Sequence, residues 1–407
     1  MSWDVSAVRR QFPFFASLER PYHYLDSAAT AQMHGAVFES MRRHDTIARG
    51  NVLRGNHRLA EAASVAFESA RGSVARFLNA AGPEEVVFTS GCTSAINLVA
   101  GALAHTLQAG DEILVSVAEH HSNFLPWQRL RERGIVLRVL PVDRRGRIVF
   151  AGLSEQIGKR CRMVALTHAS NVTGAVTATG DIAATVAAAH AVGARVLLDG
   201  AQRAPHGPVD VRALGIDFYA FSGHKCFGPT GIGALWGRRD ALAELPPFMT
   251  GGGMIGSVSL EASTWAEPPR RFEAGTPPIA QAVGLGAALE WMMSLPWQDI
   301  RAHEQGLLGT LLGELPAIPG LEIVGPTDAA QRLPVVAFRL AGLHSHDVCQ
   351  VLDGQDVAVR GGHHCAQPLH HALGVDETVR ASFSLYSDAA DVGALLAALQ
   401  RAGRVLG

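Results

Sequence analysis

The first two thirds of the chain alternate between short apolar runs and longer segments with helical periodicity. Seven runs rich in β-branched or large apolar residues have the length of strands. They cover residues 86–89, 113–117, 137–142, 163–167, 196–199, 218–222 and 233–236. Helices are predicted between them, at residues 93–107, 123–133 and 181–192. This alternation predicts an α/β fold, in which helices cover both faces of a mostly parallel sheet.

The pattern changes after residue 284. Two long helical stretches, 283–295 and 300–315, are followed by strand-like runs at 321–324, 335–340, 357–360 and 379–385 and by a last helix at 389–404. We find no internal repeat and no low-complexity linker between the two parts. The sequence therefore predicts a large α/β domain over residues 21–283 and a smaller α+β domain made of residues 1–20 and 284–407, with a broad interface between them.

The composition points to a globular protein with much buried surface. Of the 407 residues, 48% are hydrophobic and 18% are charged. The charged fraction is below the roughly 25% of an average soluble protein, and a subunit interface would account for part of the difference. The 35 basic and 37 acidic residues leave a net charge of −2 with no long block of one sign. We therefore expect no nucleic-acid partner and no binding to an acidic membrane surface.

The N-terminal segment and the cysteines bear on the cellular compartment. The first residues lack the charged start, apolar stretch and small-residue cleavage site of a secretory signal, and no uncharged run is apolar enough for a membrane span. The five cysteines are scattered and contain no CxxC pair, so we expect neither disulfides nor a metal site. These features predict a cytoplasmic protein.

A lysine follows the predicted strand at 218–222 and precedes a glycine-rich turn, in the sequence SGHKCFGPTGIG. The glycines let the backbone approach a ligand closely, and a lysine held there, Lys225, can be desolvated and form a Schiff base. A surface lysine in a hairpin turn explains this motif equally well when the motif is taken alone.

Asp199, which ends the predicted strand at 196–199, favours the first interpretation of Lys225. A carboxylate at the end of a buried strand is costly unless it meets a cation. A protonated pyridine nitrogen is such a cation, and an aspartate paired with a Schiff-base lysine is the binding pattern of pyridoxal phosphate. Alone, an aspartate in this position is more often a helix cap or a member of an ion pair. Together with Lys225 it favours the cofactor.

Two further strand ends carry polar segments. SGCTSAIN, residues 90–97, places Thr93 where a helix begins, and free N–H groups and the helix dipole favour a phosphate at that point. Ser222 and His224, beside the lysine, are placed to complete such a phosphate site, although an ordinary helix N-cap is the simpler explanation of the threonine. EHHSN, residues 119–123, offers an imidazole to a cofactor ring, but a histidine pair is also typical of metal ligands or of a polar helix start.

Cys365 lies in the segment RGGHHCAQPL, after Arg360, two glycines and two histidines. Positive neighbours and a flexible approach lower the pKa of a thiol and raise its reactivity. A single cysteine is usually a small core residue, but the polar run before this one indicates a loop. We therefore predict a reactive thiol at Cys365.

Taken together, these motifs resemble those of a known family. LDSAAT, TSGCTSAIN, EHHSNFLPW, THASNVTG, LLDGAQ, SGHKCFGPTGIG, RFEAGTP and VRGGHHCAQPL are similar to motifs of the group II cysteine desulfurases, the SufS-like and CsdA-like members of the NifS-like class-V aminotransferases. The resemblance implies the fold type I of pyridoxal-phosphate-dependent transferases. It also implies that L-cysteine is converted to L-alanine and that the sulfur remains on the enzyme as a persulfide.

The resemblance further implies a role for individual residues. The catalytic residues would be Lys225, which carries pyridoxal 5'-phosphate, His120, which stacks on its ring, and Cys365, which takes the sulfur. The cofactor would also be held by Asp199, Gln202, Thr93, Ser222 and His224, and by Thr276 from the second subunit of a homodimer. The substrate carboxylate would be bound by Arg380 and Asn171, with Arg360 and Arg54 at the mouth of the site.

The family also implies partners, and the chain departs from its usual motifs in places. A SufE-like or SufU-like protein would accept the sulfur, in a pathway such as iron–sulfur cluster assembly. The departures are Leu53, Cys92, Ser94 and Pro278, at positions that bear on the cofactor rim and the subunit interface.

Two rival functions remain open from the sequence. A related enzyme of the same fold, such as a selenocysteine lyase, another C–S lyase, an epimerase or an aminotransferase, needs Lys225 and Asp199 but not Cys365. A cofactor-binding scaffold or a sulfur-relay subunit needs no turnover.

Overall fold

A seven-stranded sheet forms the centre of the molecule in the computed structural model, which describes residues 3–53 and 55–407. The strand order is β2-β8-β7-β6-β5-β3-β4. The strands are β2 (Val86–Thr89), β3 (Glu112–Ser116), β4 (Val136–Leu140), β5 (Cys161–Thr167), β6 (Arg195–Asp199), β7 (Phe218–Ser222) and β8 (Gly233–Gly237). The five strands from β4 to β7 in this order run parallel, whereas β8 is antiparallel to both β7 and β2. The predicted mostly parallel sheet is confirmed.

Helices cover both faces of this sheet, because its strands are apolar on both sides. Successive side chains of a strand point to opposite faces, and accordingly Val196 and Leu198 belong to one core cluster while Leu197 belongs to the other. The first cluster includes residues from α4 (Arg58–Phe77), α8 (Thr179–Ala191) and α11 (Ile279–Met293). The second includes residues from α5 (Cys92–Leu103), α6 (Leu125–Arg129) and α10 (Arg239–Glu244). Apart from the edge strand β4, the strand residues are therefore buried almost without alternation, as is typical of a parallel sheet.

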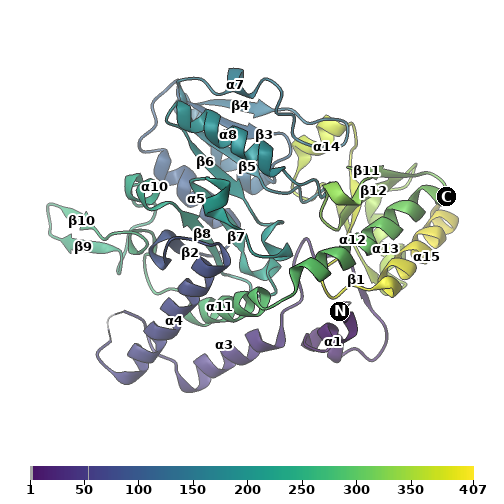
Figure 1. The fold of residues 1–407 in the computed structure, drawn as a ribbon, viewed down its shortest axis with the longest axis horizontal. Helices are drawn as coiled ribbons and strands as arrows, with labels where there is room; N and C mark the ends of the chain where they lie inside the picture. The colour runs from purple at the N-terminus through teal and green to yellow at the C-terminus, as the bar shows by residue number, and fades with distance from the viewer. Residues whose placement is uncertain (1–2, 54) are drawn as a thin grey trace.

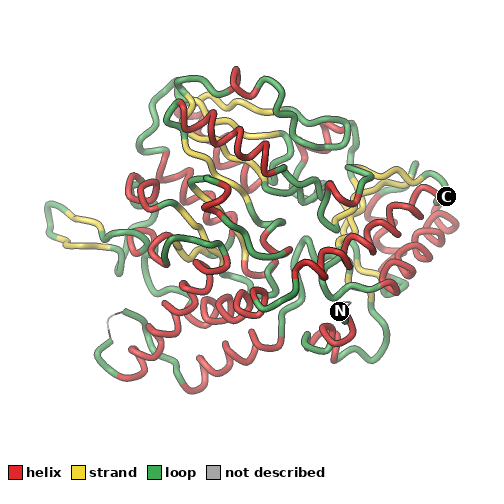
Figure 2. Tube along the Cα trace, viewed as in Figure 1, coloured by secondary structure: helices red, strands yellow, loops and turns green. Residues whose placement is uncertain are grey.

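A second, antiparallel sheet lies to the right in Figures 1 and 2. Its order is β11-β12-β15-β14, from Leu321–Val324, Val335–Leu340, Thr378–Ser382 and Arg360–Gly362. It shares a separate core cluster with α12 (Trp297–Glu314), α13 (Ser345–Asp353) and α15 (Ala389–Leu406). The shorter helices of the chain are α1 (Val5–Arg9), α2 (Pro13–Ala16), α7 (Leu153–Gln156), α9 (Val211–Leu214) and α14 (Gln367–Leu373).

The N-terminal segment connects the two cores. Arg9 forms ion pairs with Asp388 and Asp391 at the start of α15, while Phe12 is fully buried in the core of the large sheet. Further along, β1 (His23–Tyr24) pairs in parallel with β13 (Val357–Ala358). The domain boundary drawn at residues 283 and 284 stays a prediction, and α11 spans it while packing against α3 (Gly35–Ile47) and α4.

A hairpin of β9 (Ile255–Val258) and β10 (Ser263–Trp265) projects from the left side of the large unit in Figure 1. Most of its side chains are exposed, Leu260 at its tip completely. Within residues 3–53 and 55–407, no helix is long and apolar enough to cross a membrane. In the same part of the chain, no group of three or more histidine, cysteine or acidic residues is arranged to hold a metal ion.

Candidate active site

A cavity of about 310 Å³ opens where strands of the large sheet end, next to the small antiparallel sheet. Most of the predicted site residues line it, namely Thr93, His120, Asn171, Asp199, Gln202, Ser222, His224, Lys225, Arg360, Cys365 and Arg380. Thr276 lies outside it, and Arg54 is outside the described residues. A larger hollow of about 520 Å³, beside Asp143, Arg147 and Asp181, contains none of the predicted residues.

Lys225 and Asp199 lie together at the bottom of the cavity. Asp199 is the last residue of β6 and is 4% exposed, and its Oδ1 accepts a hydrogen bond from the backbone N–H of Ala201 at 2.9 Å. Lys225 follows β7, and among the described residues its amine has no hydrogen-bond or ion-pair partner. Burial lowers the pKa of Lys225, and the nearby Asp199 charge opposes that shift. The pair combines an amine that burial makes easier to deprotonate with a buried carboxylate at the end of a strand.

The ring of His120 is held in a fixed orientation. Its Nδ1 accepts a hydrogen bond from the backbone N–H of Ser122 at 3.1 Å, so a neutral ring carries its proton on Nε2. Burial, reinforced by the Lys225 charge, lowers the pKa of His120 to about 4. His120 is therefore an uncharged, flat ring at neutral pH. Opposite, the side-chain amide of Gln202 donates to the carbonyl of Ala28 at 2.8 Å.

One end of the cavity is suited to an anion. Gly91, at φ +148°, is the N-cap of α5. Glycine has no side chain with which to cap the N–H groups of the first turn. The Cys92 N–H donates to Ser222 Oγ at 2.9 Å. Thr93 and His224 add further polar groups beside this turn. Burial lowers the pKa of His224 to about 4, and a neighbouring anion would raise it again.

The features of these two regions fit pyridoxal phosphate. A partly buried lysine beside a buried carboxylate suits the aldehyde and the pyridine nitrogen, and the helix start with its serine, threonine and histidine suits the phosphate. One copy of the chain contributes all the predicted cofactor-binding residues to this cavity except Thr276, which is predicted to come from a second copy.

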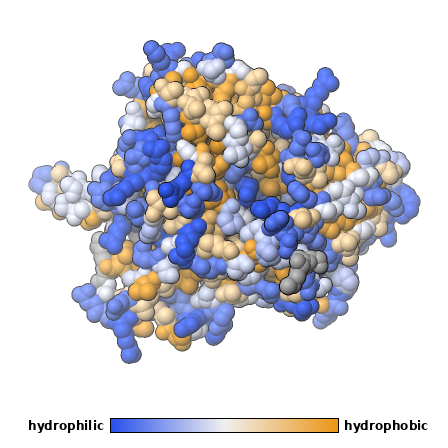
Figure 3. Space-filling model, in the orientation of Figure 1, coloured by the Kyte–Doolittle hydropathy of each residue, from blue (hydrophilic) through white to orange (hydrophobic). Residues whose placement is uncertain are grey.

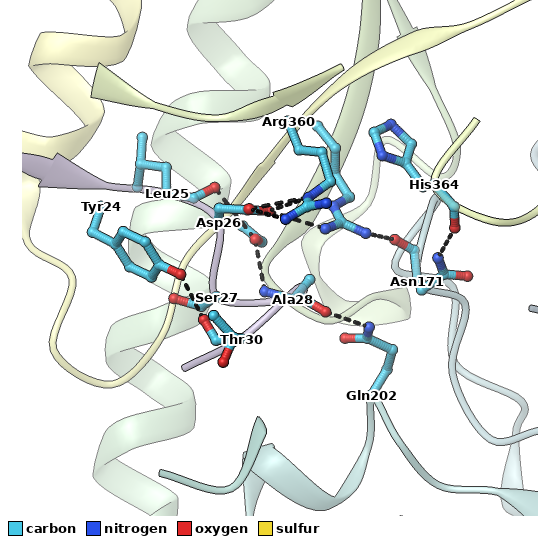
Figure 4. A network of polar contacts seen from close by, with 12 residues as sticks. Tyr24, Leu25, Asp26, Ser27, Ala28, Thr30, Asn171, Gln202, Arg360 and His364 are labelled. Carbon is cyan, nitrogen blue, oxygen red and sulfur yellow. Dashed lines mark hydrogen bonds and ion pairs between the residues drawn. The ribbon is translucent and has the colours of Figure 1, made fainter. Parts of the chain in front are cut away.

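Two arginines line the side of the cavity formed by the small sheet. Arg360 of β14 and Arg380 of β15 are directly opposite each other in the strand register. Both bind the carboxylate of Asp26, Arg360 through Nε and Nη2 at 3.0 and 2.9 Å and Arg380 through Nη2 at 3.1 Å. Arg380 also donates to the backbone carbonyl of Asn171 at 2.9 Å (Figure 4). Burial lowers the pKa of Arg380, whereas Asp26 raises that of Arg360.

Cys365 lies on the turn between β14 and α14, with its side chain exposed at the cavity. Its backbone and that of His364 are both left-handed, at φ 56° and 49°. The Cys365 carbonyl accepts from the N–H of His121 at 2.7 Å, and the His364 carbonyl accepts from the side-chain amide of Asn171 at 2.6 Å. The turn is therefore attached to the large unit through its backbone, while the thiol is free.

The other four cysteines are in different surroundings. Cys92, Cys161 and Cys226 are buried and Cys349 is partly buried, and burial raises the pKa of each of these thiols. Thiolates form least readily where the pKa is raised. Cys365 is the exposed member of the five.

Three functional contacts were not predicted from the sequence. Asp26 belongs to the quoted motif LDSAAT, but its partners lie more than 330 residues away in the chain. Cys92 donates its thiol hydrogen to Asp199 Oδ1 at 3.2 Å. His364, next to Cys365, is buried against Thr378, and burial lowers its pKa to about 2. The one signal that the sequence offers for these contacts is that Asp26 belongs to the motif LDSAAT.

Comparison with known proteins identifies relatives over the full length of the chain. A family model described as aminotransferase class-V matches residues 23–395. A probable cysteine desulfurase of Streptomyces coelicolor is 43% identical, over 99% of this chain and 98% of that protein. The crystal structure of the cysteine desulfurase CsdA from Escherichia coli, in an S-sulfonic acid form, has a TM-score of 0.91 at 39% identity and covers 100% of both chains. A C-DES variant with glycine covalently linked to its pyridoxal phosphate has a TM-score of 0.81 at 26% identity, over 96% of this chain and 98% of that one.

Proposed function

The chain belongs to the class-V aminotransferase family, as a pyridoxal-phosphate-dependent cysteine desulfurase, and from this premise we propose which residues of the cavity perform each task. The enzyme acts on L-cysteine and transfers its sulfur. Our proposal concerns the anchoring of the cofactor, the binding of the amino acid, the proton transfer and the group that receives the sulfur.

The cofactor is held by residues from four strand ends of the large sheet. Lys225 would bind it covalently, Asp199 would pair with the pyridine nitrogen, Gln202 would bond the phenolic oxygen and His120 would stack on the ring. Thr93, Ser222, His224 and the first turn of α5 hold the phosphate. When bound, pyridoxal phosphate supplies an electron-withdrawing ring that acidifies the α-carbon of an amino acid. The uncharged state of His120 supports its role, because a neutral ring stacks without a desolvation cost for charge.

The amino acid is oriented by its carboxylate. Arg380 and Asn171 bind this group, and the half-exposed Arg360 lies closer to the mouth. A guanidinium matches a carboxylate in shape and charge, and a buried one binds more strongly because less water competes. Arg54, predicted at the mouth as well, lies outside the described residues.

Lys225 and Cys365 carry out the transfers. The Lys225 amine, whose pKa burial lowers, takes the proton from the α-carbon and returns it in forming alanine. The Cys365 thiolate attacks the substrate sulfur, so that a sulfur–sulfur bond forms while the carbon–sulfur bond breaks and its electron pair remains with the carbon. In sum, L-cysteine and the Cys365 thiol give L-alanine and a Cys365 persulfide. The exposure of Cys365 supports this role, because a second protein must be able to reach the persulfide.

We propose two protein partners, a second copy of the chain and a sulfur acceptor. Thr276 is exposed and lines a separate hollow of about 430 Å³ with Arg49 and Asn51, so it serves the phosphate site of a second copy in a homodimer. A small acceptor protein, SufE-like or SufU-like, takes the sulfur from Cys365 and passes it toward iron–sulfur cluster assembly. We place the enzyme in the cytoplasm, where its five free thiols stay reduced.

The exposed Cys365 on a backbone-anchored turn is the observation that carries this proposal. Brief exposure of the holoenzyme to L-cysteine, followed by alkylation and peptide mass spectrometry, should find one extra sulfur on the peptide that contains Cys365. Cys365→Ala should still bind L-cysteine but release almost no sulfide, whereas Cys349→Ala, a matched thiol in the small unit, should retain most of the activity. Normal sulfide release by Cys365→Ala, or the added sulfur on Cys226, would overturn the assignment and favour a lyase or aminotransferase.

A further inference from the structure

Arg360 and Arg380 form a pair of like charges on adjacent strands. They are direct cross-strand partners in the antiparallel ladder of β14 and β15. The side chains of such partners project from the same face of a sheet about 5 Å apart at Cβ, and like charges placed there repel each other. Little water screens this repulsion on the Arg380 side, because the Arg380 side chain is only 3% exposed.

Asp26 is the counter-ion of this pair. It enters from the N-terminal segment, where it forms a parallel bridge with Ser382, and its side chain is 14% exposed. Arg360 binds both oxygens of Asp26 (Figure 4), and Arg380 binds Oδ1, so the single carboxylate is shared by two guanidinium groups. The three side chains together carry one net positive charge.

The hydrogen-bond donors of Arg380 are only partly used by the protein itself. Nη1 is used by the carbonyl of Asn171 and Nη2 by Asp26, while Nε is buried without a partner. A buried N–H of a charged group is rarely left unpaired, because its desolvation is costly. An incoming carboxylate that binds the Arg380 guanidinium brings the net charge of these three side chains to zero.

We propose that Asp26 is a positioning and specificity-determining residue, which holds Arg360 and Arg380 in place and restricts the site to amino acids that bring a single carboxylate. The proposal rests on the proposed function, since it assumes that these arginines bind the substrate. Without the Asp26 charge, the pair carries two positive charges and favours a ligand with two carboxylates. Without the Arg360 charge, the charges of Arg380 and Asp26 cancel, and the three side chains are neutral in sum before the substrate enters.

The test compares two ligands of nearly the same shape that differ by one negative charge, L-aspartate and L-asparagine. Their dissociation constants are measured by titration calorimetry on the holoenzyme at low ionic strength, where charge effects are least screened. Asp26→Asn should shift the preference toward L-aspartate by about tenfold or more relative to the wild type, and Arg360→Gln should shift it away by a similar factor. Asp26→Glu, the conservative control, should keep the wild-type preference.

The double variant Asp26→Asn/Arg360→Gln separates charge from structure. It restores one net positive charge, so its preference should return to within about threefold of the wild type. A merely structural Asp26 would weaken both ligands equally, leave the preference unchanged and make the double variant worse than either single one, and that result would overturn the proposal. If Asp26→Asn does not fold, Arg360→Gln alone decides by the direction of its shift.

Release of L-alanine from L-cysteine by the wild type is measured in parallel. Its absence would defeat the proposed function, and this inference with it. Its presence together with an unchanged ligand preference would defeat the assignment of Asp26 alone.

Discussion

At the scale of single residues, Cys92 shows how a departure from the family pattern is accommodated. The position usually has threonine in the family that the sequence resembles, and here a thiol donates to Asp199 at 3.2 Å. A thiol is a weaker donor than a hydroxyl. Burial and the neighbouring Asp199 charge both raise the pKa of Cys92, so the thiol keeps its proton and remains a donor.

The hydrogen bond from Cys92 can be tested by substitution. Cys92→Ala removes the donor and leaves a small void beside Asp199, and we expect a loss of about 1–3 kcal/mol in the free energy of unfolding. Cys92→Thr restores a donor of similar size and should lie closer to the wild type. Urea unfolding of the three proteins gives the comparison, and equal stability of Cys92→Ala and the wild type would contradict it.

The residue scale also shows what the sequence can predict of the site. Lys225 and Asp199 were identified because each follows an apolar run, and the ends of parallel strands meet at one edge of a sheet. The pairing of Asp26 with Arg380 has no such signal, because it joins residues 354 positions apart. The contact of the Cys92 thiol with Asp199 has no signal in the sequence either, because it depends on the close approach of α5 to the end of β6.

At the scale of elements, strands were predicted more completely than helices. The predicted runs 86–89 and 218–222 coincide with β2 and β7, since buried strands are continuously apolar. The antiparallel direction of β8 was not evident, because all its residues are buried like those of the parallel strands. The helix α4 was missed because its apolar positions are mostly alanine, and α3 was missed because only Val37 and His44 of it are buried. The exposed hairpin of β9 and β10 lacks any alternation of buried residues.

The junction of β8 with the start of α5 depends on two glycines. A Cβ on Gly233 would lie 2.5 Å from the carbonyl oxygen of Phe221 and 2.7 Å from Gly91 Cα. Gly233→Ala should therefore displace the first turn of α5, cost about 1–3 kcal/mol of stability and weaken retention of the cofactor. Gly180→Ala, in α8 with no atom near the added methyl group, is the matched control. Dialysis followed by measurement of bound pyridoxal phosphate should show a loss for Gly233→Ala alone, and equal retention by both variants would refute the packing argument.

At the scale of the whole molecule, the outer faces of α3 and α4 carry exposed apolar side chains. Phe38, Ile47 and Val65 are 48%, 67% and 65% exposed. Apolar patches appear among the polar ones near these helices at the lower left of Figure 3. Clusters of this kind commonly mark subunit interfaces, and the hollow lined by Thr276 adjoins the end of α3.

The proposed dimer leads to a prediction on this face. Ile47→Asp places a charge at the proposed interface and should shift the protein toward monomers. Because the monomer lacks the partner's contribution to the phosphate site, it should also lose pyridoxal phosphate faster. Val405→Asp, at a site of similar exposure in α15, should change neither property. Analytical ultracentrifugation with a parallel cofactor assay tests both effects, and a monomeric Ile47→Asp protein with full cofactor content would contradict the shared site.

The link between the two ends of the chain has a consequence for biosynthesis. At roughly 5–20 residues per second, a ribosome needs about 20 to 70 s to make the 354 positions between Asp26 and Arg380. The strand ends that carry Asp199 and Lys225 are made about halfway through that interval, whereas Cys365 and Arg380 come near its end. A nascent chain can thus contain Asp199 and Lys225, the proposed cofactor ligands, well before Cys365 and Arg380 have been synthesised. The Cys365 thiol is therefore added only after the residues that we propose to hold the cofactor have been made.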